Sequence, residues 1–283
     1  MMTMTQPIVV GIDGSESSLQ AADWAVDAAA RHDRQLRMVY ASFWEQYEVM
    51  SPSVGLQRPE GGMMARNVLA AAQQRATKRR PEVKVSTEVV THPPVAALLA
   101  EARGASVVVV GSRGRGQLAG MLLGTVGLGV AARATCPVVV VRGSAPAREG
   151  YYQQVVAAVK DEGHPAAVEF AFQEAGARRC AVRAIHAWLA PAEGGTGQED
   201  EETVAALLTR SLARGRELHP EVRVEEQPLR GPARSELLTA AERADLLVLG
   251  AHERRTPVGL QLGLTSHALL QHAACPVAVI PPN

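Results

Sequence analysis

The chain repeats itself, and this duplication constrains its fold more than any other feature of the sequence. The segment VVVVGSRGRGQLAGMLLGTVGLGVAARATCPVVVVR lines up without a gap against LLVLGAHERRTPVGLQLGLTSHALLQHAACPVAVIP. In this alignment Gly111 falls on Gly250, and Cys136 falls on Cys275. The beginning of each copy matches more loosely, with PIVVGIDGSESSLQAADW opposite QVVAAVKDEGHPAAVEF. A chain of 283 residues with such a repeat predicts two tandem domains of one fold.

The stretch GSAPAREGY, residues 143–151, joins the two copies. It has no hydrophobic periodicity and is typical of a short linker. We therefore expect one domain over residues 1–143 and a second over residues 152–283. Hydrophobic residues make up 47% of the chain, which is enough to fill a core in each domain.

Strand-like and helix-like segments alternate within the first copy. The strand-like runs are IVVGI, QLRMVYA, VKVSTEVV, ASVVVV and PVVVV. The segment after the first run has apolar residues at helical spacing, which we expect in the core: Leu19, Ala22, Val26 and Ala29. Ser15 or Ser17 is available as the cap of this helix. The alternation predicts α/β domains, each a doubly wound five-stranded parallel sheet with helices on both faces and a ligand crevice at the carboxyl ends of the strands.

Composition and charge argue against several classes of protein. The chain has 29 Lys and Arg against 29 Asp and Glu, so no global field draws it to nucleic acid or to an anionic membrane. We interpret the basic run KRRPEVK, residues 78–84, as the solvated end of a helix. The three cysteines lack C-x-x-C spacing, so we expect buried thiols in a reducing compartment rather than zinc ligands or disulfides. No apolar run approaches the roughly 18 residues that span a bilayer, and no leader is recognisable, so we expect a cytoplasmic protein.

The glycine-rich loop GSRGRGQLAGMLLGT, residues 111–125, is the strongest candidate for a ligand site. It packs five glycines and two arginines into fifteen residues directly after the run ASVVVV, which has the pattern of a strand buried on both faces. Glycines let backbone N–H groups approach a ligand closely, and Arg113 and Arg115 add positive charge, so an anion such as phosphate is the expected ligand. Structural turns between strand and helix are also rich in glycine, and the glycine count alone leaves that alternative open.

Spacing distinguishes three kinds of phosphate loop. A P-loop requires a lysine after its second glycine, but Gln117 follows Gly116. A dinucleotide fingerprint requires an acid about 20 residues beyond the glycines, but the sequence from Gln117 to Arg148 contains no Asp or Glu. The third pattern is G-x-x-G, nine residues, then G-[ST], and four residues fit it without adjustment: Gly111, Gly114, Gly124 and Thr125.

Three stretches of the first copy, IVVGIDGS, GSRGRG to LLGT, and CPVVVV, together resemble the universal stress proteins, and the duplicated layout resembles their tandem two-domain members from actinobacteria. The resemblance covers nearly the whole chain, most strongly residues 7–142 and 244–281. For members with this glycine motif, it implies ATP binding, together with Mg²⁺, in a five-stranded parallel domain. It also implies dimeric assembly and a regulatory or stress-survival role with little or no turnover.

The resemblance further implies which residues hold the nucleotide, and the positive charge of Arg113 adds this residue to the candidate site. From the base to the phosphates these are Asp13 near adenine and ribose, Val39 against the base, Gly111 and Gly114 along the ribose and phosphates, and Gly124, Thr125 and Val126 around the phosphates. Elementary physics agrees, because the first N–H groups of a helix that begins at Gly124 and Thr125 favour an anion. The alternative role of Asp13 is to cap the first helix. Residues 126–129, VGLG, replace the family's usual polar turn, and because each glycine weakens a helix by roughly 1 kcal/mol, we expect a looser phosphate side.

The second copy departs further from the motif. Glu253 and Leu264 replace its second glycine and its threonine. Lys160 or Asp161, depending on how the shortened loop is aligned, takes the place of Asp13. A carboxylate facing phosphates is repulsive, so we expect this domain to be degenerate and the chain to bind about one ATP.

Three functions remain for the chain. The leading hypothesis is an ATP-binding regulatory module whose conformation or unknown protein partner depends on nucleotide occupancy. The second is a weak ATPase or nucleotidyl transferase that uses the same pocket, although the sequence offers no recognisable general base, arginine finger, hydrolase motif or metal-ligand cluster. The third is a nucleotide-free stress scaffold.

Two further features concern assembly and access. The final strands, PVVVV and PVAVI, are apolar edges that would be sticky unless paired, so we expect an intramolecular pseudo-dimer, or a homodimer. Residues 42–62 form a long connection between strand and helix, and two interpretations stay open for it: a cover over the nucleotide, or a flexible loop.

Overall fold

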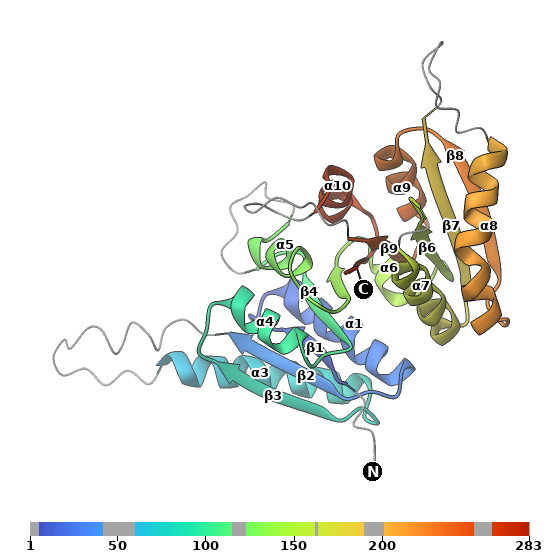
Figure 1. Ribbon diagram of the computed structural model, residues 1–283. Coiled ribbons are helices and arrows are strands. Elements are labelled where there is room, and N and C mark those ends of the chain that lie inside the picture. Colours follow the sequence, from blue (N-terminus) through green and yellow to red (C-terminus); the bar gives the residue numbers. More distant parts are fainter. Residues whose placement is uncertain are drawn as a thin grey trace. The chain divides into compact units, whose positions relative to one another are not determined.

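The computed structural model describes residues 6–41, 60–114, 123–161, 164–189, 201–251 and 262–282. The chain divides into two compact units, Met1–Val141 and Arg142–Asn283. In each unit, helices cover a layer of parallel strands (Figure 1), which confirms the predicted fold class. Among the described helices, none has the length and apolar character needed to cross a bilayer.

The first unit alternates strands and helices along its described residues. Its elements are β1 (Ile8–Gly11), α1 (Glu16–Arg31), β2 (Leu36–Ala41), α3 (Glu60–Arg79), β3 (Val85–Val90), α4 (Pro94–Ala102), β4 (Val107–Gly111), α5 (Thr125–Ala131) and β5 (Val138–Val141). The strands pair in parallel in the order β3-β2-β1-β4-β5. Helices α1 and α3 pack together on one face, and α4 and α5 pack together on the other. The winding reverses between β1 and β4, so the chains leaving these strands diverge and open a crevice at their carboxyl ends.

The second unit has the same plan. Its elements are α6 (Ala145–Glu149), β6 (Gln154–Ala158), α7 (Pro165–Arg178), β7 (Ala181–Trp188), α8 (Glu201–Leu218), β8 (Val224–Arg230), α9 (Ala233–Ala241), β9 (Leu246–Gly250), α10 (Leu264–His272) and β10 (Val277–Ile280). Its described strands pair in parallel in the order β10-β9-β6-β7-β8. The winding reverses between β6 and β9, at the counterpart of the switch point in the first unit.

The stretch expected to be an aperiodic linker contains the short helix α6. The Ser144 hydroxyl oxygen caps it by accepting a hydrogen bond from the Ala147 N–H at 3.3 Å. Gly150 ends it in the left-handed conformation, with φ of 80°, which glycine adopts without strain. A helix of five residues is too short to show apolar periodicity, so only its cap residues could have revealed it. The domain boundaries at residues 143 and 152 stay a prediction.

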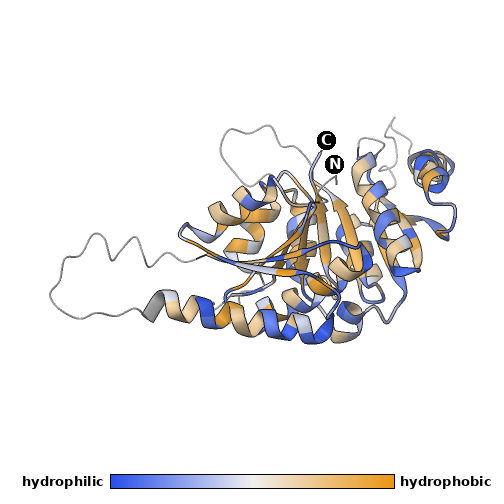
Figure 2. Ribbon diagram, turned by 90° about the horizontal axis from the view of Figure 1, so that it is seen from below, coloured by the Kyte–Doolittle hydropathy of each residue, from blue (hydrophilic) through white to orange (hydrophobic). Residues whose placement is uncertain are grey.

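Apolar residues gather in the strands and on the inner sides of the helices (Figure 2). Three of the four core positions expected on α1 are buried, whereas Leu19, in the first turn of the helix, is only half-buried. Cys136 and Cys275 are buried as expected, while Cys180 is half-buried. Burial raises the pKa of the Cys136 thiol to about 11 and that of Cys275 to about 12, so neither forms a thiolate at neutral pH.

An ion-pair cluster fastens α3 to α1. The Asp27 carboxylate, on the buried face of α1, accepts hydrogen bonds from Arg79 Nη2 and from Arg80 Nε, both at 2.7 Å. The basic run at the end of α3 therefore has a structural role in holding the two helices together.

Candidate functional site

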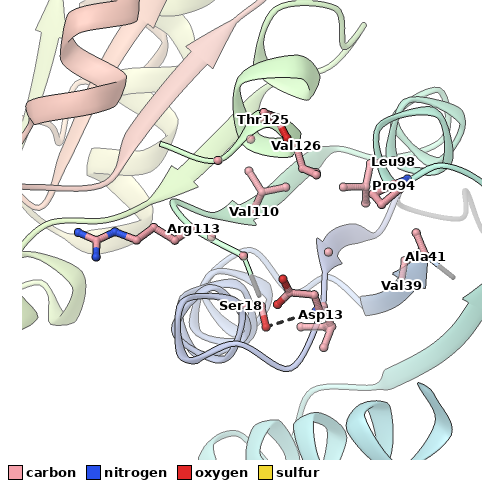
Figure 3. Close-up of a pocket in the computed structure, with 16 residues that line it drawn as sticks. Asp13, Ser18, Val39, Ala41, Pro94, Leu98, Val110, Arg113, Thr125 and Val126 are labelled. Atoms are coloured by element: carbon pink, nitrogen blue, oxygen red, sulfur yellow. Dashed lines mark hydrogen bonds between the residues drawn. The ribbon is translucent and has the colours of Figure 1, made fainter. Parts of the chain in front are cut away.

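A cavity of about 390 Å³ opens at the carboxyl ends of the strands in the first unit. This volume lies within the usual range of small-molecule sites, roughly 300–1,000 Å³. Its lining comes from the ends of β1, β2 and β4, the turn before α1 and the start of that helix, the loop after β4, and the amino-terminal parts of α4 and α5 (Figure 3). These segments meet because parallel strands end at the same edge of a sheet, and because the register sets Val10 of β1 beside Val109 of β4.

All eight residues proposed from the sequence line this one cavity. They are Asp13, Val39, Gly111, Arg113, Gly114, Gly124, Thr125 and Val126. The lining residues that sequence reasoning missed are Gly11, Ile12, Ser18, Ala41, Pro94, Leu98, Val110 and Gly127. Most of these are immediate neighbours of the motif residues. Pro94 and Leu98 are different, because they come from α4, and the only signal for them is that α4 begins just after the carboxyl end of β3.

Asp13 lies in the turn between β1 and α1. Its Oδ1 accepts hydrogen bonds from the Ser15 N–H at 2.9 Å and from the Ser15 hydroxyl at 2.6 Å. The Ser15 hydroxyl oxygen in turn accepts from the Ser18 N–H at 3.2 Å and caps α1. The helix cap is therefore Ser15, and Asp13 orients that cap instead of replacing it.

Ser18 closes the same turn from inside the fold. Its hydroxyl oxygen accepts the N–H groups of Asp13 at 3.3 Å and Gly14 at 3.1 Å, and it donates to the Ser15 carbonyl at 2.9 Å. Figure 3 shows the bond between Ser18 and Asp13 at the floor of the cavity. The buried hydroxyl thus fixes the turn that presents the Asp13 carboxylate to the cavity.

Close contacts explain why the first two glycines of the loop carry no side chain. A Cβ at Gly111 would lie 2.5 Å from Ser17 Oγ and 2.7 Å from the Ser17 carbonyl carbon and oxygen, so no larger residue fits where α1 crosses the end of β4. A Cβ at Gly114 would lie 2.8 Å from Asp13 Oδ2. The sequence suggested that these glycines let a ligand approach the backbone; the structure adds that they let the two walls of the cavity approach each other.

The first turn of α5 forms the far wall. Gly124 is the N-cap of α5, and its N–H donates to the Ser112 carbonyl at 2.7 Å. Residues 125–127 form the first turn of α5 and line the cavity. Their N–H groups precede the point at which a helix can pair an N–H with a carbonyl four residues earlier within itself. Gly127 and Gly129 are both buried, and a Cβ at Gly129 would lie 3.2 Å from Val95. These glycines therefore let α5 pack closely. This packing is a physical reason why residues 126–129 differ from the polar turn that is usual in the family.

The cavity is apolar at one end and polar at the other. Its apolar wall consists of Ile12, Val39, Ala41, Pro94, Leu98 and Val110. Asp13 is the one acidic residue among the described residues that line it. Arg113 contributes to the rim, but its side chain is exposed, and Figure 3 shows its guanidinium extending away from the other labelled residues. Within the described part of the chain, no group of three or more His, Cys, Asp or Glu side chains is arranged to hold a metal ion.

The corresponding edge of the second unit carries different chemistry. Counting from paired strands, Lys160 follows Val155 as Asp13 follows Ile8, so the strand register favours Lys160 as the counterpart of Asp13. Leu264, at the place of the motif threonine, is 82% exposed. Glu253, Arg115 and most of the connection at residues 42–62 lie outside the described residues.

Comparison with known proteins finds similarity to one protein family over both units. A sequence model of the Universal stress protein family matches residues 4–142 and 151–281. A universal stress protein of Mycolicibacterium smegmatis is 32% identical over 296 residues, which cover 98% of this chain and 97% of that protein. One from Mycobacterium tuberculosis is 35% identical over 249 residues, covering 87% of this chain and 88% of that protein. The crystal structure of a universal stress protein from Archaeoglobus fulgidus has the same fold, with a TM-score of 0.73 at 18% identity over 98% of this chain and 99% of that one.

Proposed function

Because the chain belongs to the universal stress protein family, we propose that its first unit binds ATP in this cavity and that nucleotide occupancy controls its conformation or its binding to a protein partner. One observation carries the proposal: the eight residues selected by motif and resemblance, from segments up to about a hundred residues apart, line a single cavity of about 390 Å³. The second unit supplies a structural counterpart and holds no ATP in the same manner.

The chemistry of the cavity matches the parts of a nucleotide. The adenine ring lies against the apolar wall around Val39 and Leu98, because burying its faces there removes apolar surface from water. The Asp13 carboxylate accepts hydrogen bonds from ribose hydroxyls. The phosphates lie at the first turn of α5, where the first N–H groups of the helix and its dipole favour negative charge and where the Thr125 hydroxyl can donate. The glycine backbone at Gly114 is a cradle that a side chain would fill.

Mg²⁺ fits this arrangement as a companion of the nucleotide. It keeps several waters and is usually held by one or two carboxylates together with substrate phosphates. Asp13 is the carboxylate within the lining, and one of its oxygens already binds Ser15. The nucleotide's phosphates and bound waters would therefore provide most of the ion's ligands, and Asp13 at most one.

Binding without rapid turnover is the role that the lining favours. Hydrolysis requires a group that orients or deprotonates the attacking water, and a cation that neutralises the charge developing on the phosphates. Among the described lining residues, Asp13 is occupied with the turn before α1, and the Arg113 guanidinium extends away from the cavity. We therefore propose a regulatory binding module rather than an ATPase or nucleotidyl transferase.

Isothermal titration with ATP and Mg²⁺ tests the proposal through the variant Gly114→Asp. The added carboxylate would face the phosphates, and like charges about 4 Å apart repel by roughly 4 kcal/mol near a protein surface, so we expect affinity to fall by more than about 100-fold. Gly104→Asp is the matched control, because a Cβ at Gly104 meets nothing within 4 Å, and it should bind as the wild type does.

Two outcomes would contradict the assignment. Wild-type affinity in Gly114→Asp, with its melting temperature unchanged, would show that ATP does not occupy this cavity. If chromatography detects rapid formation of ADP or of a nucleotidyl product by the wild-type protein, the enzyme is favoured over the regulatory module.

A further inference from the structure

Ser17 connects the two loops that form the cavity, although it does not line the cavity itself. It lies in the first turn of α1, and its hydroxyl oxygen accepts a hydrogen bond from the Arg113 N–H at 3.1 Å. Its backbone also lies directly against the Cα of Gly111, at the end of β4. The start of α1 and the start of the glycine loop are thus held together at two points by one residue.

The peptide group that Ser17 holds is also bonded to α5. The Arg113 N–H and the Ser112 carbonyl belong to the same peptide unit, and that carbonyl accepts the Gly124 N–H at 2.7 Å. Because a peptide unit is planar, fixing the direction of its N–H fixes the direction of its C=O. Ser17 therefore sets the orientation of the carbonyl that receives the N-cap of α5.

In the second unit, His164 occupies the position that corresponds to Ser17. His164 is the N-cap of α7 and lies over Gly250 as Ser17 lies over Gly111: a Cβ at Gly250 would be 2.6 Å from His164 Cδ2. The backbone after each strand is held alike, with the Ser112 N–H donating to Val141 and the Ala251 N–H donating to Ile280. His164, however, engages the carbonyl end of the next peptide, since its Nε2 lies 3.2 Å from the Ala251 oxygen. The position is occupied in both units: a hydroxyl oxygen holds the N–H end of the peptide unit in the first, and an imidazole lies against the carbonyl end in the second.

We infer that Ser17 is a positioning residue of the first unit's ligand site. Through the peptide unit of Ser112 and Arg113, it orients the N-cap of α5, and with it the N–H groups proposed to bind phosphate. The part of this inference that concerns ATP rests on the proposed function; the part that concerns the peptide unit does not. Ser17 acts through the backbone and touches no ligand.

The variant Ser17→Ala tests the inference, with amide hydrogen exchange measured by NMR in the nucleotide-free protein. Exchange should accelerate at Arg113, which loses its acceptor, and also at Gly124, whose N–H bonds the carbonyl of the same peptide unit. ATP affinity should fall about fivefold, the effect of one ordinary hydrogen bond.

Ser106→Ala is the matched control. The Ser106 hydroxyl donates to the Pro7 carbonyl at 3.1 Å, at the amino end of β4 and away from the cavity. This variant, like Ser17→Ala, removes one half-buried hydroxyl that bonds a backbone group, so the two variants should lower the melting temperature by similar amounts. Ser106→Ala should leave both Gly124 exchange and ATP affinity unchanged.

Unchanged exchange at Gly124 in Ser17→Ala would overturn the inference, because the peptide unit would then not transmit the loss. Faster exchange at Gly124 with unchanged ATP affinity would also overturn the positioning role. A wild-type protein that binds no ATP would instead contradict the proposed function, while the exchange measurements would still decide the role of Ser17 in the apo protein.

Discussion

The two oxygens of Asp13 allow its structural role and its proposed binding role to be separated. Oδ1 accepts two hydrogen bonds from Ser15, at 2.9 Å and 2.6 Å, and Oδ2 faces Gly114 across the cavity. Asp13→Asn keeps an oxygen at the first position and replaces the second oxygen with an NH₂ group, which donates and cannot accept from a ribose hydroxyl. Asp13→Ala removes both.

The structure gives a different magnitude for each variant. A typical intramolecular hydrogen bond contributes about 1 kcal/mol, so Asp13→Ala should lower the free energy of unfolding of the first unit by about 2 kcal/mol, and Asp13→Asn by less than about 0.5 kcal/mol. Loss of a charge-assisted bond to the ribose should weaken ATP binding by about 1.5–3 kcal/mol, which is roughly 10- to 100-fold, in both variants.

Urea denaturation and isothermal titration measure these two effects separately. The expected pattern is a stable Asp13→Asn protein that binds ATP poorly, beside an Asp13→Ala protein that is both less stable and poor in binding. Wild-type ATP affinity in Asp13→Asn would refute the placement of the ribose at this carboxylate. Equal stability of the two variants would refute the role given to Oδ1 in the turn.

Three other measurements follow from the structure. Gly111→Ala should destabilise the first unit by about 1–3 kcal/mol, because the new Cβ overlaps the backbone of Ser17, whereas Gly104→Ala should be nearly neutral in denaturation. Burial raises the pKa of Asp27, but hydrogen bonds from Arg79–Arg80 outweigh burial and leave that pKa below its usual 3.8. Asp27→Asn should therefore lower the free energy of unfolding by about 2 kcal/mol above roughly pH 4, and this loss should shrink as the pH falls further and the wild-type carboxylate is protonated. Equilibrium dialysis should return about one ATP per chain, and two equivalent sites would show that the second unit binds phosphate by other residues.

Features that depend on local pattern could be predicted before the fold was known. Alternating apolar runs and the gap-free duplication predicted two doubly wound units, because the period of a strand or helix is set by residues close together in the chain. The glycine spacing predicted that Gly111, Gly114 and Gly124 would act together, since each of these residues belongs to one continuous loop. The cap signals of α6 were also present in the sequence, but a helix of five residues carries no period to draw attention to them.

Which distant residues meet depends on how the strands are ordered and how the helices pack. The order β3-β2-β1-β4-β5 places the exits of β1 and β4 side by side, and this adjacency puts Ser17 against Gly111 and Asp13 opposite Gly114. The apolar wall contributed by Pro94 and Leu98 has the same origin, because α4 returns over the sheet beside β1 and β4. These contacts depend on strand order and on the packing of helices against the sheet, which no local spacing specifies. For that reason local spacing could select residues that line one cavity, whereas strand order and helix packing decide what holds them in place.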